Sequence, residues 1–395
     1  MNLNINYLAN QFVFYHLKKI NHGYLQIVDW NDKEYFFGDK TSDLKARIKI
    51  NHSDFFLRLL RRGSSGLGES YINSEFETED LSSLIELSAK NIDVTYKFSG
   101  FFQFFFINNF LSKNIFSNTK KRSQKNISLH YDLGNEFFSS FLDKTLTYSC
   151  GIFNSPDETL EKAQINKYNK LIDLVKPKNG DKILEIGCGW GGFAEYLAKN
   201  YNVKIDCITI SKKQFLFTKQ RIRQSGLTKK VDVKMMDYRD VKKKYDIIVS
   251  IEMIEAVGEK YLNEYFNVIK KNLTSGGRGA IQAIIIKDEL YSRYRNREDF
   301  IQKYIFPGGF LPSFKSLNQL SERSGLKIEN YQLYGNHYSN TLQKWREKFL
   351  NSWDAISRQG FDASFKKMWD FYFSYCDAGF KSKNINLVQF SLCNK

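Results

Sequence analysis

The sequence predicts an α/β protein in which a doubly wound, mainly parallel sheet follows a smaller N-terminal α+β domain. Three observations lead to this fold class. Apolar strand segments alternate with amphipathic helix segments between residues 160 and 286, and a glycine-rich turn joins one of these strands to its helix. The first 100 residues show short alternating segments instead, which are typical of antiparallel strands. A doubly wound sheet holds its ligand at the carboxyl ends of the strands.

The central strand is predicted at residues 182–186, KILEI, because its apolar residues form a short, partly β-branched run. Glycines follow at positions 187, 189, 191 and 192, and residues 193–201 have the apolar spacing of a helix. A strand, a glycine turn and a helix in this order let a ligand approach the main chain at the helix N-terminus.

Three features indicate which nucleotide this turn binds. Glu185 lies two residues before the first glycine, where it disfavours a pyrophosphate and suits a cationic or hydroxyl-rich ligand. No Lys-Ser or Lys-Thr pair follows the glycines, which excludes an ATP-type phosphate loop. A second strand, at residues 203–210, arrives at the ~20-residue spacing expected of a ribose contact. These features favour S-adenosylmethionine over NAD or ATP.

The chain carries a net charge of +16, from 59 Lys and Arg against 43 Asp and Glu. Such an excess attracts an anionic partner, either nucleic acid or phospholipid headgroups. A composition that is generally rich in Lys and Asn would give the same excess, so both interpretations stay open.

The five cysteines form no C-x-x-C pair and lack metal-ligand spacing, so no metal site is predicted. Their odd number, and an N-terminal segment unlike an export signal, favour a reducing cytoplasm. No apolar run approaches the ~20 residues that span a bilayer, and we expect no transmembrane segment.

The N-terminal α+β domain is predicted to span residues 1–111. Three antiparallel strands are expected within residues 20–50, followed by a helix that the glycine loop at 63–68 ends and a further helix at 81–91. A polar linker at 112–126 leads into the catalytic domain, residues 127–395.

The aromatic stretch at 101–111, with lysines and an arginine after it, has two open interpretations. It is either a core or inter-domain helix followed by a solvated linker, or an interfacial anchor whose aromatic rings lie among lipid headgroups.

In the catalytic domain, Asn135 is expected to cap a helix that carries Phe137, Phe138, Phe141 and Leu142 on one side. The remaining elements follow the α/β alternation. Strands are predicted at 231–237, 245–254 and 280–286, helices at 159–175, 212–226 and 259–273, a lid at 287–315, an amphipathic helix at 345–380 and a last edge strand at 385–392.

Polar residues at the predicted strand ends are the first site candidates. Glu252 and Glu255 follow the fourth strand, and we favour Glu255 as the functional carboxylate. Asp237 ends the third strand, where it could accept the adenine amino group while Tyr238 covers the ring. After the second strand, Thr209, Ser211 and Gln214 are better placed as ligands than Asp206, which lies mid-strand. His130 and Cys150, taken alone, are interpreted as structural.

Several motifs in order resemble one family. Their residues are HYDLGNEFF (130–138), TYSCGIF (147–153), AQ (163–164), LEIGCGWGGFAEYLA (184–198), ITISKKQ (208–214), YDIIVSIEMIEAVG (245–258) and YIFPGGFLPS (304–313). The set closely resembles the cyclopropane-fatty-acyl-phospholipid synthases and their mycolic acid relatives. GSSGLGESY (63–71) resembles the N-terminal domain of the bacterial enzyme, so the likeness covers nearly the whole chain.

The resemblance implies a class I S-adenosylmethionine-dependent methyltransferase fold with a Rossmann-like sheet. It also implies the activity of a cyclopropane fatty acid synthase, which adds a methylene across cis double bonds of phospholipid acyl chains. Methyl transfer to the alkene gives a carbocation, and a bicarbonate ion then assists its deprotonation. A dry, aromatic-rich pocket would protect that cation from water.

Carried over residue by residue, the resemblance assigns two sets of site residues. The cofactor set is Tyr148, Ser149, Gly187, Gly189, Thr209, Ile210, Gln214, Asp237 and Tyr238. The catalytic set is Cys150, Glu255, Gln282, Ile284, Tyr338 and His130, of which the first five would contact bicarbonate.

Gln282 departs from the bacterial and mycobacterial pattern, which has His at this position, and resembles plant-type members. A Gln donates an amide hydrogen bond to an anion but carries no positive charge. A hydride shift before deprotonation is therefore the alternative, and it gives methylene- or methyl-branched acyl chains.

Partners and location follow from the same resemblance. We expect unsaturated phospholipids at the membrane surface as substrate, a cytoplasmic, peripherally membrane-associated protein and a homodimer. A nucleic-acid methyltransferase is disfavoured because the sequence holds neither a Pro-Pro-Tyr motif nor a Pro-Cys nucleophile. A non-catalytic lipid-binding protein is the remaining rival.

Overall fold

The computed structural model describes residues 5–103, 118–120, 122–123, 126 and 133–394. The chain forms two compact units. One comprises Met1–Ile115, Glu298–Ile305 and Trp353–Asn384, and the other comprises Phe116–Arg297, Phe306–Ser352 and Ile385–Lys395. Two segments that the sequence analysis placed in the domain at 127–395 thus belong by their contacts to the first unit.

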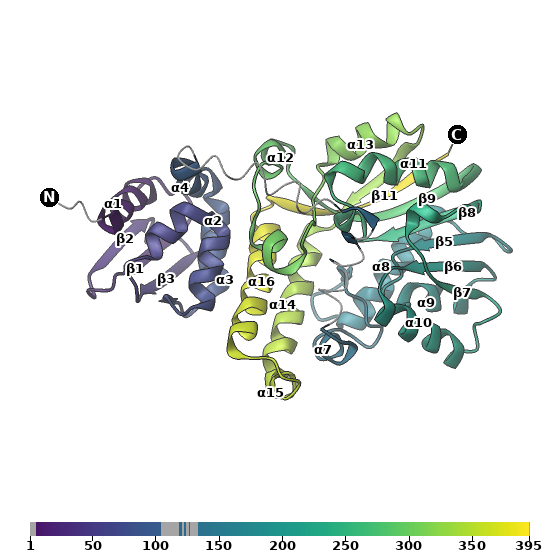
Figure 1. Ribbon diagram of the computed structural model, residues 1–395, viewed down its shortest axis with the longest axis horizontal. Coiled ribbons are helices and arrows are strands. Elements are labelled where there is room, and N and C mark those ends of the chain that lie inside the picture. Colours follow the sequence, from purple (N-terminus) through teal and green to yellow (C-terminus); the bar gives the residue numbers. More distant parts are fainter. Residues whose placement is uncertain (1–4, 104–117, 121, 124–125, 127–132, 395) are drawn as a thin grey trace. The chain divides into compact units, whose positions relative to one another are not determined.

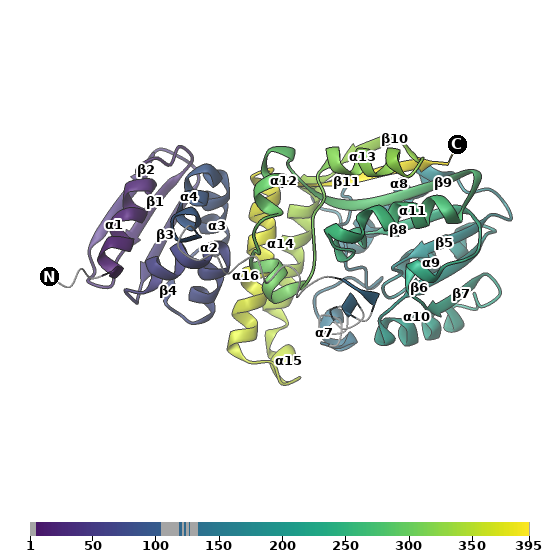
Figure 2. The same ribbon diagram turned by 45° about the horizontal axis from the view of Figure 1, so that its top comes forward.

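The second unit is built on a seven-stranded sheet with the order β10-β11-β9-β8-β5-β6-β7 (Figures 1 and 2). Its strands are β5 (Lys182–Ile186), β6 (Lys204–Thr209), β7 (Val231–Met235), β8 (Tyr245–Ile251), β9 (Leu273–Ile286), β10 (Lys327–Leu333) and β11 (Ile385–Cys393). The strands from β7 to β9 pair in parallel, and β11 runs antiparallel to both β9 and β10. The predicted doubly wound sheet is confirmed.

Helices pack along these strands and enclose the core of the second unit (Figure 2). They are α8 (Leu160–Val175), α9 (Gly192–Asn200), α10 (Lys212–Gln224), α11 (Leu262–Asn272), α13 (Phe314–Arg323) and α14 (Gly335–Asn351), and the unit also contains α7 (Asn135–Ser139) and α12 (Asp288–Tyr294). Short 3₁₀ turns follow the strands at Tyr238–Asp240, Ile254–Ala256 and Glu259–Tyr261. Covered on both faces, β5 and β8 are almost continuously apolar, as a buried parallel sheet requires.

Side-chain caps start two of the helices where the sequence predicted them. Thr159 accepts the N–H of Lys162 at the start of α8, and Ser211 accepts the N–H of Gln214 at the start of α10. The predicted cap at Asn135 is wrong. Asn135 is the first residue of α7, and its Oδ1 accepts the indole N–H of Trp190 at 2.8 Å instead.

Two predictions at the C-terminal end need correction. The last strand, β11, is not an edge, because β10 lies beyond it. β10 escaped prediction because its sequence, KIENYQL, is mostly polar and exposed. The helix predicted at 345–380 is divided into α14, α15 (Trp353–Ser357) and α16 (Ala363–Lys381), with Gly360 in a left-handed turn between the last two.

The first unit contains a four-stranded sheet with the order β2-β1-β3-β4 and several helices. Its elements are α1 (Ile5–Leu17), β1 (Tyr24–Val28), β2 (Glu34–Gly38), β3 (Lys45–Ile50), α2 (Phe55–Ile72), β4 (Phe76–Glu77), α3 (Leu81–Lys90), α4 (Ile92–Gln103), a π-helical turn (Ile301–Ile305), α15 and α16. The smaller α+β domain is thus present. From residue 104 on, the predicted stretch at 101–111 lies outside the described residues.

Two details of this unit differ from the prediction. β3 pairs with β1 in parallel, because the chain after the β1–β2 hairpin returns to the far side of β1. Gly63, with φ of 55° and ψ of −129°, interrupts the helical backbone of α2 as predicted, but the residues after it up to 68 are helical rather than a loop. Within the described part of the chain, no helix has the length and apolar character needed to cross a membrane.

Helix α2 packs closely against an aromatic cluster of the first unit. Tyr71 donates to Asp370 on α16 at 2.7 Å. One turn earlier, Gly68 lies against the ring of Phe300, which is itself 4.5 Å from the ring of Phe371 between centroids. A Cβ at Gly68 would come within 2.4 Å of a Phe300 ring carbon. Glycine at this position is therefore a packing requirement.

We predict that Gly68→Ala destabilises the first unit by about 1–3 kcal/mol, because an added methyl group overpacks a site bounded by two rings. The better helix propensity of Ala offsets only part of this cost. Lys40→Ala, an exposed change elsewhere in this unit, is the control and should shift stability by less than about 0.5 kcal/mol. Urea unfolding of both variants tests this, and equal midpoints would contradict it.

Candidate active site

The glycine turn after β5 has a backbone that glycine adopts without strain. Gly187, Gly189 and Gly191 have φ angles of 81°, 52° and 81°. A Cβ atom at Gly187 would lie 2.7 Å from Met253 Cγ, and one at Gly191 would lie 2.6 Å from Thr218 Cγ2. A Cβ at Gly189 would meet no atom within 4 Å, and this residue lines a pocket. Two of the glycines therefore permit close packing, while Gly189 leaves room for a ligand.

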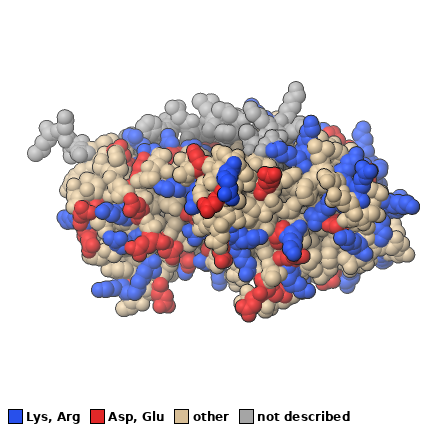
Figure 3. Space-filling view, turned by 90° about the horizontal axis from the view of Figure 1, so that it is seen from below, with Lys and Arg blue, Asp and Glu red and all other residues tan. Residues whose placement is uncertain are grey.

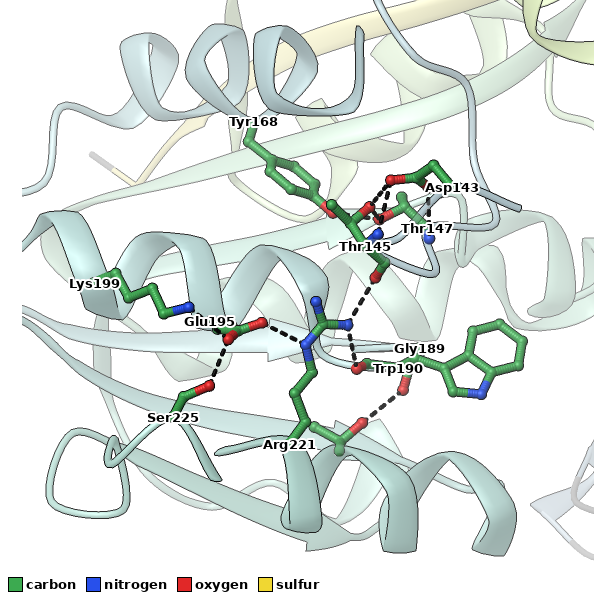
Figure 4. Close-up of polar contacts among 11 residues, drawn as sticks. Asp143, Thr145, Thr147, Tyr168, Gly189, Trp190, Glu195, Lys199, Arg221 and Ser225 are labelled. Carbon is green, nitrogen blue, oxygen red and sulfur yellow. Dashed lines mark hydrogen bonds and ion pairs between the residues drawn. The ribbon is translucent and has the colours of Figure 1, made fainter. Parts of the chain in front are cut away.

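Arg221 on α10 connects this turn to the loop at Thr145 and to helix α9, as Figure 4 shows. Its Nη1 donates to the carbonyl oxygens of Thr145 and Trp190 at 2.7 and 3.2 Å, and its Nε pairs with Glu195 on α9. Two further donors reach the same carboxylate, Lys199 and Ser225. Burial acts to raise the pKa of Glu195, but these donors lower it to about 2. The ion pair therefore stays charged at any ordinary pH.

The pocket beside the turn collects residues from the carboxyl ends of β5, β6, β7 and β8. All nine residues predicted for the cofactor line this one pocket: Tyr148, Ser149, Gly187, Gly189, Thr209, Ile210, Gln214, Asp237 and Tyr238. Glu185 and Glu252 line it as well. Burial raises the pKa of Glu185 to about 8, so this carboxyl is largely neutral at pH 7.

The loop before α8 contributes Tyr148 and Ser149 to the pocket. Ser149 is fixed twice, because Lys167 Nζ donates to its Oγ at 2.7 Å and Gln164 Nε2 donates to its carbonyl at 2.8 Å. Lys167 is completely buried, which lowers its pKa to about 8. A buried cation of this kind needs anions nearby, and the negative charge that most strongly raises the pKa of Lys167 is that of Glu252.

Asp237 and Tyr238 close the pocket after β7. The guanidinium of Arg239 donates to both oxygens of Asp237, at 2.8 and 2.7 Å. Burial acts to raise the pKa of Asp237, but these bonds hold it below its usual value. A carboxylate retains lone pairs for a further donor, so Asp237 keeps the capacity for the predicted adenine contact. Tyr238 packs edge-on against Tyr265 at 5.6 Å.

After β6, Thr209 Oγ1 donates to Gln214 Oε1 at 2.9 Å and so orients the amide. Ser211 serves as the cap of α10 and is absent from the pocket lining. Asp206 accepts a hydrogen bond from Tyr245 OH at the start of β8 and pairs with Lys234 on the neighbouring strand β7, each at 2.7 Å. Its carboxylate therefore makes contacts between strands and does not line the pocket, as its mid-strand position predicted.

Glu252, at the end of β8, is the centre of the second part of the site. The backbone N–H of Cys150 donates to its Oε1 at 2.9 Å, and Gln282 Nε2 donates to the same oxygen at 2.6 Å. Tyr338 OH donates to Oε2 at 2.5 Å. The residue has φ of 48°, in the left-handed region that non-glycine residues rarely adopt. Burial outweighs these bonds and raises the pKa of Glu252.

The amide of Gln282 has a defined orientation. Gln389 on β11 lies opposite Gln282 on β9 in the antiparallel ladder, and its Nε2 donates to Gln282 Oε1 at 2.8 Å. With its oxygen engaged in this way, Gln282 presents its NH₂ group to Glu252 and, at 3.4 Å, to the carbonyl of Cys150.

Glu255, on the turn Ile254–Ala256, binds a different group. Its Oε1 accepts the backbone N–H of Ile284 at 2.6 Å, whereas its buried Oε2 has no hydrogen-bond partner among the described residues. Burial and the neighbouring charge of Glu252 raise the pKa of Glu255 to about 8. Glu255 is therefore largely protonated at neutral pH.

Five of the six residues predicted for catalysis are thus brought together, whereas His130 lies outside the described residues. Cys150, Gln282 and Tyr338 meet at Glu252, and Ile284 meets Glu255. The sequence analysis ranked Glu255 above Glu252, yet Glu252 is the carboxylate that both lines the pocket and collects the donors. Three residues were missed: Lys167, Gln389 and Arg239. None belongs to a motif, and only their contacts reveal them.

Comparison with known proteins identifies the family. The family described as mycolic acid cyclopropane synthetase matches residues 118–390. The chain belongs to this family. Among its relatives, the tuberculostearic acid methyltransferase UfaA1 of Mycobacterium tuberculosis is 35% identical over 85% of this chain and 80% of its own length. The cyclopropane-fatty-acyl-phospholipid synthase of Escherichia coli K12 is also 35% identical, over 87% of each chain.

Solved structures of mycolic acid cyclopropane synthases have the same fold. MmaA2 from Mycobacterium tuberculosis is 28% identical with a TM-score of 0.64, and CmaA1 bound to S-adenosylhomocysteine and CTAB is 26% identical with a TM-score of 0.65. Each covers 68% of this chain and 98% of its own. The second unit is accordingly a class I methyltransferase fold, and the chain is an S-adenosylmethionine-dependent enzyme of the cyclopropane synthetase family.

We predict that Arg221→Ala weakens the binding of S-adenosylhomocysteine by about tenfold or more. The change removes the donor of two carbonyl groups and one of the three donors of Glu195, at about 1–3 kcal/mol, and 1.4 kcal/mol corresponds to about a tenfold change in Kd. Arg223→Ala, an exposed change two residues away, is the matched control. Isothermal titration calorimetry measures both, and equal affinities would rule out a bracing role for Arg221.

A second prediction concerns the pH dependence of stability. The pKa of Glu255 is about 8 in the folded protein and 4.5 in its ordinary state. Between these values the folded state binds more protons than the unfolded state, so this residue makes the free energy of unfolding fall as pH rises. Glu255→Gln keeps the acceptor for Ile284 and removes the titration. The stability of the variant relative to the natural protein should therefore rise between about pH 5 and 8, as measured by urea unfolding. A pH-independent difference would refute this assignment.

Proposed function

We propose that this protein is a cyclopropane fatty acid synthase, which adds a methylene carbon from S-adenosylmethionine across a cis double bond of a phospholipid acyl chain. One observation carries the proposal. The carboxylate of Glu252 lines the cofactor pocket and accepts a hydrogen bond from Tyr338, a member of an aromatic cluster. A base between a methyl-donor site and an aromatic wall suits a reaction that passes through a carbocation.

The residues of the pocket fit S-adenosylmethionine. Open space at Gly189 accepts the ligand close to the main chain, Asp237 can accept the adenine amino group, and Gln214 lies at the strand end where a ribose belongs. The paired or neutral states of Asp237 and Glu185 leave Glu252 as the carboxylate that balances a sulfonium charge. When bound, the cofactor supplies an electrophilic methyl group.

Aromatic rings surround the place where the alkene would react. Tyr148 lines the pocket, and its ring lies 5.2 Å from Trp345, while Tyr338 lies 6.3 Å from the same ring. Phe138 and Phe141 pack against Tyr148 at 5.3 and 6.1 Å. Such a wall excludes water, which would trap a cation, and its ring faces stabilise positive charge. An apolar wall also suits an acyl chain.

Bicarbonate does not fit this donor set well. Cys150 N–H, Gln282 Nε2 and Tyr338 OH already donate to the carboxylate of Glu252, and the N–H of Ile284 already donates to Glu255. An added anion would therefore compete with two resident carboxyl groups for the same donors. We derive no step through bicarbonate.

A branched product is the second candidate, and Gln282 favours it. A neutral amide stands at the position where the resemblance expects His, so no positive charge from this residue acts on the carbocation. A carbocation that persists longer before deprotonation can undergo a hydride shift, which gives a branched chain. The equal identity to a cyclopropane synthase and to a tuberculostearic acid methyltransferase leaves both products open.

The basic residues of the second unit provide a means of approaching a phospholipid surface. Exposed Lys and Arg side chains of residues 201–244 are Lys204, Lys212, Lys219, Arg223, Lys229, Lys242, Lys243 and Lys244. Figure 3 shows Lys and Arg side chains interspersed with acidic ones over one face. The attraction to an anionic lipid surface would therefore come from particular groups of basic residues rather than from a uniformly positive face. Peripheral membrane association, the cytoplasmic location and the homodimer stay predictions.

The test is turnover with vesicles. Purified protein, S-adenosylmethionine and vesicles of a cis-unsaturated phospholipid should give S-adenosylhomocysteine and acyl chains that have gained one CH₂. Vesicles of the matched saturated lipid should give neither, because they lack the nucleophilic double bond. Proton NMR of the product separates a cyclopropane ring from an exocyclic alkene. A non-catalytic lipid-binding protein would bind the vesicles without turnover, which would refute the proposal.

A further inference from the structure

We propose that the carboxylate of Glu252 is the catalytic base of this enzyme and takes the place of a bound bicarbonate. The inference rests on the proposed function and identifies the atom that receives the proton. It makes the reaction independent of bicarbonate, which distinguishes this chain from what the family resemblance implies.

The first support is the set of donors. Bicarbonate and a carboxylate both present two oxygens on one carbon, and both need converging N–H and O–H groups. Of the contacts assigned by resemblance to bicarbonate, Cys150, Gln282 and Tyr338 converge on Glu252 at 2.9, 2.6 and 2.5 Å. The side chain of Glu252 thus has the hydrogen bonds that a free anion would need.

The second support is the position of Glu252 relative to its neighbour. Glu252 lines the cofactor pocket together with Gly187 and Met253, whereas Glu255 is absent from that lining. Glu255 has one oxygen on Ile284 N–H and a raised pKa, so it is neutral. Burial raises the pKa of Glu252, but the donors Cys150 N–H, Gln282 Nε2 and Tyr338 OH, together with the nearby Lys167, favour its charged form. The carboxyl group that collects hydrogen-bond donors is therefore the one that faces the pocket.

The third support is the backbone. A non-glycine residue with a left-handed φ costs about 1–3 kcal/mol and persists only where surrounding contacts hold it. At Glu252 this backbone is held by its own N–H, which donates to the carbonyl of Gln282 at 2.8 Å. Strain at the end of β8 thus accompanies the carboxylate that lines the pocket, and strained residues of this kind cluster at functional sites.

The chemical step balances without another reactant. The π electrons of the alkene form a bond to the incoming methyl carbon as the C–S bond breaks and its electron pair stays on sulfur. A Glu252 oxygen then takes a proton from that methyl group, and the electron pair of the C–H bond closes the three-membered ring. Glu252 is left as a neutral carboxylic acid and returns its proton to solvent after the product leaves. If a hydride shift comes first, the same oxygen takes the proton that yields the alkene.

The experiment compares three proteins in bicarbonate-free buffer under argon and in buffer with added sodium bicarbonate. The natural protein should be equally active in both. Glu252→Gln keeps the size of the side chain but cannot accept the proton, so activity should fall about a hundredfold or more, with or without bicarbonate. Glu252→Gly suits the left-handed backbone and vacates the anion position. It should be inactive alone and regain activity with bicarbonate or formate.

Two controls make the result interpretable. Glu322→Gln, an exposed change on α13, should behave as the natural protein does. Binding of S-adenosylhomocysteine by each variant shows that its pocket has folded. The comparison of the natural protein with and without bicarbonate tests the proposal independently of any variant.

The opposite outcomes are equally definite. A natural protein that requires bicarbonate, a Glu252→Gln variant with near-normal turnover, or a folded Glu252→Gly variant that neither anion restores would overturn the role of Glu252. If the natural protein gives no product under any condition, the proposed function itself fails.

Discussion

The hydrogen bonds to Glu252 connect parts of the chain that are far apart in sequence. Cys150 comes from the loop before α8, Gln282 from the middle of β9, and Tyr338 from the first turn of α14. A carboxylate removed from water is costly unless such donors replace its hydration. The strand order, in which β9 lies between β8 and β11, brings Gln282 beside Glu252. The chemistry of the site therefore depends on this strand order. Gln389 extends the same constraint by fixing the amide of Gln282 from the neighbouring strand.

The site uses left-handed backbone in two opposite ways. At Gly187, Gly189 and Gly191 the conformation is free of steric cost and allows close approach, either of packed side chains or of a ligand. At Glu252 the same conformation is strained, and hydrogen bonds of the side chain and main chain maintain it. The first use shapes a pocket. The second holds a functional group at its wall, and the four positions lie at the ends of two paired strands, β5 and β8.

Sequence reasoning was most successful where local pattern decides structure. Buried parallel strands are continuous apolar runs and the turn after β5 needs glycine, so the doubly wound sheet and the place of a pocket at its strand ends could be predicted from local pattern. The family resemblance, and not local pattern, supplied Tyr148 and Ser149. Local pattern does not reach what a distant contact decides. Glu252 and Glu255 are three residues apart and chemically alike, and only the backbone angle and the partners separate them. The polar strand β10 and the role of Gln389, which depend on pairing with β9 and β11, have no local signal.

The charges of the site remain balanced through the proposed reaction. With the cofactor bound, Glu252 would be the carboxylate available to its sulfonium charge, and it would lie close to the positive charge that methyl transfer places on the acyl chain. Transfer of the proton to Glu252 removes the positive charge from the acyl chain and the negative charge from the carboxylate in one step. A cationic His in place of Gln282 would need a further anion to maintain this balance, whereas a neutral amide does not. The pairing of Gln282 with Glu252 is thus electrostatically consistent: one residue supplies the anion, and the other binds it without adding charge.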